Sequence, residues 1–176
     1  MVYFVSDTHF GHFNIIRYCG RPFTTVEEMD ETLIANWNLV VTPDDTVWHV
    51  GDFTLSNRRD IINGLAARLN GHKNLVMGNH DRQRPNVYLE AGFETVIGPR
   101  KSYRVQGLNL ITGGRQVVLM HHPPELESNG DIILHGHVHD KSGPPRRNIY
   151  NISVEVTDYR PVTLPQILGR QYGTNG

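Results

Sequence analysis

The sequence predicts an α/β fold, because strand-like and helix-like segments alternate through its first half. Short runs rich in β-branched and aromatic residues occur at Val2–Val5, Thr46–Val50 and Asn74–Met77. The segments between these runs carry apolar residues at helical spacing. This β-α-β-α-β order predicts parallel strands joined by right-handed crossovers. A chain of 176 residues is long enough for one domain with a buried core.

The first predicted helix begins with a capping box. Thr25 is the expected N-cap, and Glu28 stands three residues later as its expected partner. The apolar residues that follow share one helical face: Val26, Met29, Leu33, Ile34 and Trp37. Residues 43–45, Pro-Asp-Asp, then turn the chain into the second strand.

The second predicted helix follows Ser56 or Asn57, either of which can cap it. Its expected apolar face comprises Ile61, Ile62, Leu65 and Leu69.

The second half of the chain has few helical signals. The expected strands are Thr95–Ile97, Tyr103–Ile111, Gln116–Met120, Asp131–Leu134 and Ile149–Val156, with a hairpin turn at Gly113-Gly114. We therefore expect this half to be richer in antiparallel strands and to pack on the first half. Residues 1–170 are predicted to form a single domain, and residues 171–176 a disordered tail.

The composition excludes several classes of protein. Lys and Arg total 17 against 18 Asp and Glu, a formal net charge of -1, which disfavours stable nucleic-acid binding and membrane-surface binding. Cys19 is the single cysteine, so an intrachain disulfide and a cysteine-based zinc site are both excluded. The first five residues, MVYFV, are too short for a signal peptide, and no apolar run approaches the roughly 18 residues of a membrane span. A cytoplasmic protein is expected.

Polar residues that can bind metals follow the carboxyl ends of five predicted strands. These segments are Ser6-Asp7-Thr8-His9, Gly51-Asp52, Gly78-Asn79-His80-Asp81, His121-His122-Pro123 and His135-Gly136-His137-Val138-His139. Ligand sites of open α/β sheets form beyond the carboxyl ends of the strands, so these side chains are expected to meet in one place.

The residue types in these segments favour a metal site. Carboxylates, imidazoles and one carboxamide suit Mn, Fe or Zn, and their number suggests two ions, which in such sites lie about 3.5–4 Å apart. On an extended backbone, His137 and His139 have Cα atoms about 6–7 Å apart, so each ring can reach a different ion. Taken singly, each motif has an ordinary explanation; Asp81, for example, could cap a helix near Pro85. The ordered set favours the site.

The ordered set resembles the calcineurin-like metallophosphoesterase superfamily. The matching blocks, which run from residue 7 to residue 139, are Asp7-x-His9, Gly51-Asp52, Gly78-Asn79-His80-Asp81, His121 and Gly136-His137-x-His139. The resemblance implies a four-layer α-β-β-α sandwich of two mixed β-sheets flanked by helices. Residues 7–12, DTHFGH, also resemble the opening of a compact bacterial and phage subgroup.

The resemblance implies a role for each matching residue. One metal would be held by Asp7, His9 and His139. The other would be held by Asn79, His121 and His137, with Asp52 bridging both. His121 is preferred to His122 because it stands two residues before Pro123. His80 would be the catalytic histidine outside the ligand set, oriented by Asp81.

The reaction implied is hydrolysis of a phosphoester by a hydroxide bridging two divalent ions, with Mn²⁺ favoured and Fe, Zn or Ni as alternatives. The preferred substrate is a small nucleotide-type phosphodiester, of which a cyclic nucleotide is one example. The alternatives are a phosphomonoesterase and a non-catalytic metal-binding scaffold of the same fold. A nuclease is disfavoured by the near-neutral charge.

Several basic residues remain outside the ligand set. The candidate substrate contacts are His12, Arg17, Arg21 and His122, followed by Arg82, Arg84, Arg146 and Arg147. The other histidines are expected beside the ligands or in packing at His135, in the core at His49 and on the surface at His72. Trp37 and Trp48 are expected in the core.

Overall fold

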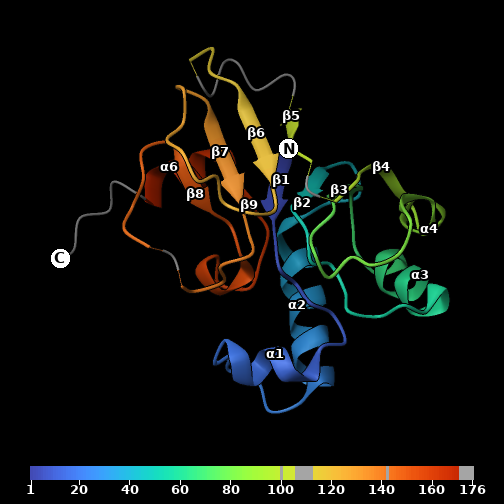
Figure 1. Ribbon diagram of the computed structural model, residues 1–176. Coiled ribbons are helices and arrows are strands. Elements are labelled where there is room, and N and C mark those ends of the chain that lie inside the picture. The colour runs from blue at the N-terminus through green and yellow to red at the C-terminus, as the bar shows by residue number, and fades with distance from the viewer. Residues whose placement is uncertain (100, 106–112, 142, 171–176) are drawn as a thin grey trace.

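The computed structural model describes residues 1–99, 101–105, 113–141 and 143–170. Two β-sheets pack against each other, and helices flank them (Figure 1). The strands of the first sheet, in spatial order, are β4 (Phe93–Ile97), β3 (His72–Val76), β2 (Thr46–His49), β1 (Val2–Val5) and β9 (Val162–Thr163). The strands of the second are β5 (Tyr103–Val105), β6 (Val117–Met120), β7 (Ile132–His135) and β8 (Ile149–Asn151). The predicted fold class, two mixed sheets flanked by helices, is confirmed.

The first sheet follows the predicted βαβ order. Strands β1 to β4 pair in parallel, and the short β9 pairs antiparallel with β1. The two long helices are α2 (Val26–Val40) and α3 (Arg59–Ala67), which connect β1 to β2 and β2 to β3. The carboxyl ends of β1, β2 and β3 therefore lie at the same edge of the sheet.

The helix starts differ from the predictions in detail. Thr25 caps α2 as expected, because its hydroxyl accepts a hydrogen bond from Glu28 N–H at 3.1 Å. The Glu28 carboxylate, however, bonds back to the N–H and hydroxyl of Thr24. The N-cap of α3 is Arg58 rather than Ser56 or Asn57, because the Ser56 hydroxyl accepts from Arg58 N–H before the helix begins.

The apolar face of α3 is narrower than predicted. Ile62 and Leu69 are buried, whereas Ile61 is exposed, since it lies one residue off the face that meets the sheet. Two short helices were not predicted, α1 (Phe13–Tyr18) and α6 (Leu164–Arg170), whereas α4 (Pro85–Glu90) begins at Pro85, near which a helix was expected. Helices of six or seven residues are too short to show a repeated apolar period.

The second half of the chain is richer in antiparallel pairing than the first, as predicted, but its sheet is mostly parallel. Among the described strands of this sheet only β5 and β6 are antiparallel, and the expected turn, where Gly113 and Gly114 have φ of 63° and 85°, lies between them in the sequence. β6, β7 and β8 run parallel. The crossovers from β6 to β7 and from β7 to β8 are each about a dozen residues long, and their described residues form loops rather than helices. Such loops carry no helical periodicity, so the sequence did not indicate parallel strands here.

One strand prediction was too long, and part of another lies outside the described residues. The predicted strand over residues 149–156 ends at Asn151 and continues as a 3₁₀ helix, η1 (Val154–Val156). The predicted strand Tyr103–Ile111 is described over residues 103–105 as β5, and its remaining residues, 106–111, lie outside the described part of the chain, as does the predicted tail over residues 171–176.

Alternation along the strands divides the core into layers. In β1, Tyr3 and Val5 pack against the helices, whereas Phe4 faces the second sheet. Val117 and Leu119 of β6 meet Phe4 between the sheets. This period of two fixes which face of each strand is buried between the sheets. Among the described helices, none is long and apolar enough to cross a membrane.

His49 lies in the core, as predicted. Its ring is 0% exposed, stacks on Trp37 at a centroid distance of 6.5 Å, and lies 2.9 Å (Nε2) from the Thr8 hydroxyl. Because that hydroxyl donates to the Phe53 carbonyl, it accepts from His49 Nε2–H. Burial lowers the pKa of His49 to about 3, so the ring is neutral in the folded protein.

This buried ring predicts a loss of stability in acid. The folded pKa of about 3 lies below the ordinary histidine pKa of 6.5, so the unfolded chain binds more protons between these values. As pH falls through this window, the free energy of unfolding should decrease by up to about 1.4 kcal/mol per pH unit from this group. His49→Gln, which keeps a donor for Thr8 but does not titrate, should reduce that slope.

Urea unfolding near pH 7 and near pH 5, with a chelator present, measures this difference. Equal slopes for His49→Gln and the wild type would contradict the assignment.

Candidate metal centre

Five of the predicted ligands share an unusual backbone conformation. The φ angles are 59° at Asp7, 51° at His9, 58° at Asp52, 71° at His137 and 52° at His139. Residues other than glycine rarely adopt positive φ, and each such residue costs about 1–3 kcal/mol. The loops after β1, β2 and β7 are therefore held in strained turns that bring these side chains together.

Backbone hydrogen bonds join the loop after β1 to the loop after β2. Asp7 N–H donates to the Gly51 carbonyl at 3.0 Å, and His9 N–H donates to the Asp52 carbonyl at 3.0 Å. The two loops thus continue the parallel pairing of their strands beyond the sheet, which fixes the carboxylates and imidazole they carry.

The Asp7 carboxylate joins the two sheets. Both of its oxygens lie 3.1 Å from His137 N–H, and one accepts from the Ser153 hydroxyl at 2.8 Å. Asp7 follows β1 of the first sheet, whereas His137 and Ser153 follow β7 and β8 of the second. These bonds leave the carboxylate oriented for coordination, because backbone and hydroxyl donors fix its plane.

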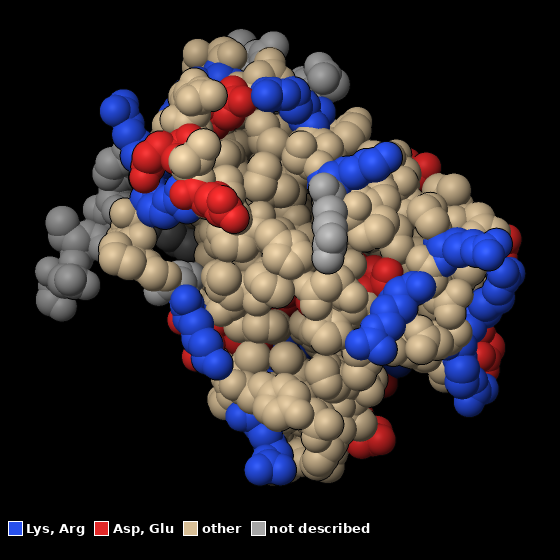
Figure 2. All heavy atoms as spheres, in the orientation of Figure 1, with Lys and Arg blue, Asp and Glu red and all other residues tan. Residues whose placement is uncertain are grey.

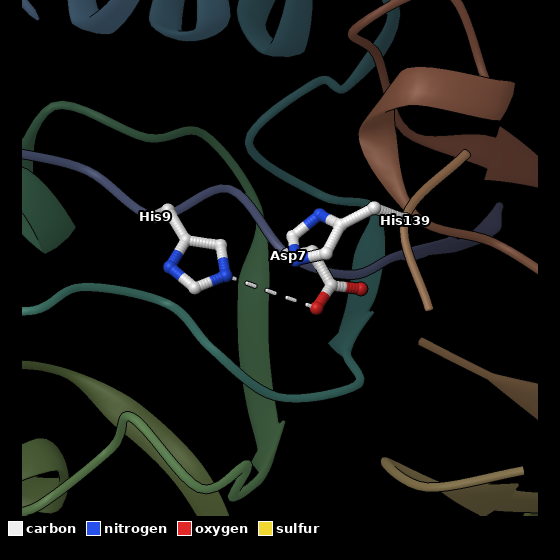
Figure 3. A group of neighbouring side chains, drawn as sticks. All are labelled: Asp7, His9 and His139. Carbon is white, nitrogen blue, oxygen red and sulfur yellow. Dashed lines mark ion pairs between the residues drawn. The ribbon is translucent and has the colours of Figure 1, made fainter. Parts of the chain in front are cut away.

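One ligand group contains Asp7, His9 and His139, which each offer an atom within 4.8 Å of the others (Figure 3). His9 Nε2 is buried and has no hydrogen-bond partner among the described residues. It lies 3.4 Å from Asp52 Oδ2 and 4.0 Å from Asp7 Oδ1. A buried ring nitrogen facing two carboxylates without a hydrogen bond fits a metal ligand.

The second ligand group contains Asp52, His121 and His137. His121 Nδ1 lies 2.9 Å from the Val50 carbonyl and carries the ring proton there, which leaves Nε2 for coordination. That Nε2 is 3.3 Å from Asp52 Oδ2 and 3.1 Å from Asn79 Oδ1. His137 Nδ1 is 3.0 Å from the same Asn79 oxygen. The carboxamide of Asn79 therefore belongs to this group.

The charge of the centre favours cations. Burial opposes ionisation of Asp52, but the His121 and His9 rings beside it hold its pKa well below the usual range. Burial also opposes a charge on His121, yet Asp52 and Asp7 raise the pKa of His121 to about 9. The surrounding carboxylates thus favour a cation at His121, which is a proton when no metal ion is bound and which a metal ion would replace.

Three glycines precede ligands because there is no room for a side chain. A Cβ on Gly136 would lie 2.0 Å from Ser6 Oγ and 2.3 Å from Asp7 Oδ2. A Cβ on Gly78 would lie 2.2 Å from Asp52 Oδ1, and one on Gly51 would lie 2.3 Å from His121 Nδ1. These glycines let the backbone of one strand end approach the ligand of another.

A buried ion pair supports the first ligand group, and it corrects the prediction for Arg21. The Arg21 side chain is 0% exposed and donates to Glu155 and to the Asp7 and Thr8 carbonyls, so it is not available to a substrate. Glu155 Oε1 also lies 2.8 Å from His139 Nδ1.

Glu155 orients a predicted ligand, although no spacing signal in the sequence marks it. It forms a third close group with Cys19 and His139. Burial opposes a charge on His139, but hydrogen bonds with Cys19 and Glu155 raise the pKa of His139 to about 10. A carboxylate behind a ligand histidine fixes its ring and raises its basicity.

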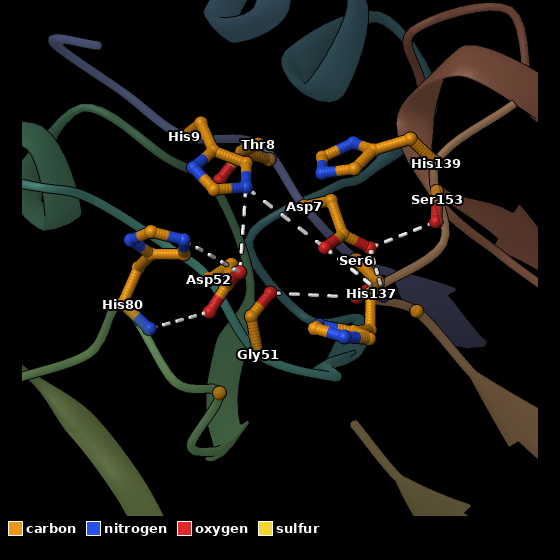
Figure 4. Close-up of polar contacts among 12 residues, drawn as sticks. Ser6, Asp7, Thr8, His9, Gly51, Asp52, His80, His137, His139 and Ser153 are labelled. Carbon is orange, nitrogen blue, oxygen red and sulfur yellow. Dashed lines mark hydrogen bonds and ion pairs between the residues drawn. The ribbon is translucent and has the colours of Figure 1, made fainter. Parts of the chain in front are cut away.

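His80 lies beside the shared carboxylate. Its backbone N–H donates to Asp52 Oδ1 at 2.8 Å, and its Nε2 is 4.0 Å from Asp52 Oδ2 (Figure 4). The side chain is 31% exposed and its ring is 5.1 Å from that of His9. His80 can therefore face both solvent and the ligand cluster.

Asp81 differs from the prediction that it orients His80. Its carboxylate accepts hydrogen bonds from the N–H groups of Gly78 at 2.8 Å, Asp52 at 2.8 Å and Phe53 at 2.9 Å. It does not cap α4 either, whose N-cap is Arg84. Burial, together with the charge of Asp52, raises the pKa of Asp81 to about 6. Asp81 thus holds the loop that presents Asp52.

The remaining candidates lie in different places. His12 is buried, with Nδ1 3.3 Å from His9 Nδ1. Arg17 is exposed in the last turn of α1. His122 is exposed, with its ring 4.0 Å from that of His137. His135 is buried and bonded to the Gly136 carbonyl.

The arginines named as further candidates divide similarly. Arg82, Arg84 and Arg147 are exposed. Arg146 donates to the carbonyls of Pro124, Glu125 and Leu126, so it fastens the loop after β6.

Residues 1–141 match the sequence model of the calcineurin-like phosphoesterases. The chain belongs to this family. It is a metal-dependent phosphoesterase, a hydrolase of phosphate esters, and its relatives typically bind two divalent ions, which fits the two ligand groups. The superfamily predicted from the sequence is confirmed.

Relatives occur in archaea and in phages. The chain is 40% identical over 177 residues to an uncharacterized protein of Methanocaldococcus jannaschii, covering 95% of this chain and 89% of that protein. It is 30% identical over 159 residues to the Gene 66 protein of Mycobacterium phage L5, covering 78% and 76%. The crystal structure of a protein of unknown function from Aquifex aeolicus has a TM-score of 0.73 and 27% identity, covering 97% of this chain and 98% of that one.

The close approach at Gly136 predicts that Gly136→Ala weakens metal binding. The added Cβ must displace Ser6 or Asp7, so the affinity for Mn²⁺ should fall by roughly tenfold or more. Gly64→Ala is the control, because a Cβ there meets nothing within 4 Å. Titration calorimetry measures both. Unchanged affinity in Gly136→Ala would contradict the packing argument.

The contact behind His139 predicts that Glu155→Gln also weakens metal binding. The substitution keeps the shape but removes the charge that pairs with Arg21 and orients His139, so Mn²⁺ affinity should fall about tenfold to a hundredfold. Glu94→Gln, at an exposed pair with His72, should leave it unchanged. Equal affinities in the two variants would show that Glu155 only supports the fold.

Proposed function

We propose that the protein hydrolyses small nucleotide-type phosphodiesters, with two divalent ions at the candidate metal centre. The observation that carries the proposal is the position of Asp52, whose Oδ2 lies 3.4 Å from His9 Nε2 of the first group and 3.3 Å from His121 Nε2 of the second, with the partly exposed His80 beside it. Mn²⁺ is the preferred ion, because the proposed ligands are carboxylates, imidazoles and one carboxamide.

Each ligand has a defined task in this proposal. Asp7, His9 and His139 would hold one ion. Asn79, His121 and His137 would hold the other, and Asp52 would contact both. Divalent ions in such a site lower the pKa of water and neutralise the phosphoryl oxygens. The neutral carboxamide of Asn79 limits the negative charge that an anionic substrate meets.

His80 is the proposed proton donor. Its ring lies outside both ligand groups, yet Nε2 is 4.0 Å from Asp52, so it reaches the position where an ester would bind. A proton held at Nε2 can pass to the leaving oxygen as the ester bond breaks. Its backbone bond to Asp52 keeps the residue close to the ions during the reaction.

The charges near the centre support a diester. Arg21, the arginine buried behind the centre, is committed to Glu155 and to two backbone carbonyls. Neutralisation of the phosphate therefore falls mainly to the metal ions, and a diester carries one negative charge where a monoester carries up to two. On the face drawn in Figure 2, basic side chains are interspersed with acidic ones, which supports a small substrate rather than a nucleic-acid track.

The test compares bis(p-nitrophenyl) phosphate with p-nitrophenyl phosphate, with and without Mn²⁺. We expect Mn²⁺-dependent hydrolysis with the diester preferred. A preference for the monoester would indicate a phosphomonoesterase instead. No hydrolysis of either ester by protein that binds two ions would support the non-catalytic scaffold.

His80→Ala should lower turnover of the diester about a hundredfold to ten-thousandfold, because it removes the proposed proton donor. Two ions should still bind, since the ring belongs to neither ligand group. His72→Ala, at an exposed histidine that begins β3 at the end opposite the site, is the control and should keep wild-type turnover. Turnover retained in His80→Ala with both ions bound would reject the assigned role.

A further inference from the structure

A cavity of about 470 Å³ opens beside the second ligand group. It is lined by Lys101, Ser102, Met120, His121 and His122. Because β5 and β6 are antiparallel, with Tyr103 opposite Leu119, the residues that precede β5 lie next to those that end β6. The cavity therefore lies where the first residues before β5 meet the carboxyl end of β6.

The cavity adjoins the proposed position of the phosphate. His121 is both a wall of the cavity and a member of the second ligand group. The ring of His122, another wall, lies 4.0 Å from the ring of His137, which belongs to the same group. A phosphoryl group held by that group would thus have one ester substituent directed into or alongside the cavity.

We infer that this cavity binds the nucleoside of the substrate, with Lys101 as its polar anchor. The inference rests on the proposed function. It places the nucleoside, one of the two ester substituents of the phosphodiester, in the cavity. The volume lies in the range of small-molecule sites, about 300–1,000 Å³. A phosphate alone would leave such a space unused.

The walls suit a planar ring with polar edges. The exposed His122 ring and the Met120 side chain offer the flat and polarisable surfaces on which bases pack, whereas the buried His121 closes the wall beside the metal centre. Ser102 supplies a hydroxyl, and Lys101 is the one cationic side chain among the lining residues that the structure describes. Its ammonium has three donors for base carbonyls, ring nitrogens or a second anionic group.

Binding of two probes tests the assignment. Calorimetry on the Mn²⁺-loaded protein compares adenosine 5′-monophosphate with inorganic phosphate, which share a phosphoryl group and differ by the nucleoside. The wild type should bind the nucleotide at least about tenfold more tightly. Lys101→Ala, which removes the anchor, and Ser102→Trp, which fills the cavity, should each lower this ratio about tenfold.

Arg58→Ala removes an exposed cation at the start of α3 and should keep the wild-type ratio. A wild-type ratio near one, or a ratio that neither cavity variant lowers, would overturn the inference. If the wild type hydrolyses the diester but the cavity variants keep the wild-type ratio of nucleotide to phosphate affinity, the nucleoside site is rejected and the proposed function stands. If the cavity variants lower this ratio but the wild type hydrolyses no diester, the nucleoside site stands and the proposed function is rejected.

Discussion

The carboxylate of Asp52 is the group on which the rest of the centre depends. Its Oδ2 lies 3.4 Å from His9 Nε2 and 3.3 Å from His121 Nε2, one nitrogen from each ligand group. Its own position depends on Asp81, which holds the backbone N–H groups around it, and on Gly78, which leaves room for its oxygen. A change at either place would move a carboxylate that faces a nitrogen of each group, so the two groups are coupled through one side chain.

The sequence was most informative where residue type and strand end coincide. The segments around Asp7, Asp52, Asn79, His121 and His137 were located because each follows an apolar run, and parallel strands bring such ends together. The first sheet was predicted for the same reason, since helices separate its strands. The parallel order of the second sheet was not, because its crossovers are loops that carry no periodic signal.

The supporting contacts were also beyond prediction, because they depend on distant pairings. Arg21 and Glu155 are 134 residues apart and meet only after both sheets have formed. Nothing in the local sequence distinguishes a buried arginine from an exposed one, so Arg21 was assigned to the substrate. Asp81 was assigned to His80 from its place in a motif, whereas its carboxylate is used by three backbone N–H groups.

Strained backbone conformations lower the stability of this chain relative to the same fold with unstrained residues at those positions. The strained residues are those with positive φ in the candidate centre: Asp7, His9, Asp52, His137 and His139. Glycine would adopt the same turns without steric cost. If these side chains had no role as metal ligands, mutations to glycine at these positions would therefore stabilise the fold. Carboxylates and imidazoles at these positions keep the loops in a strained backbone conformation. Bound cations would offset the free-energy cost of that strain. The ligand loops are therefore the part of the molecule whose order should depend most on ionic conditions.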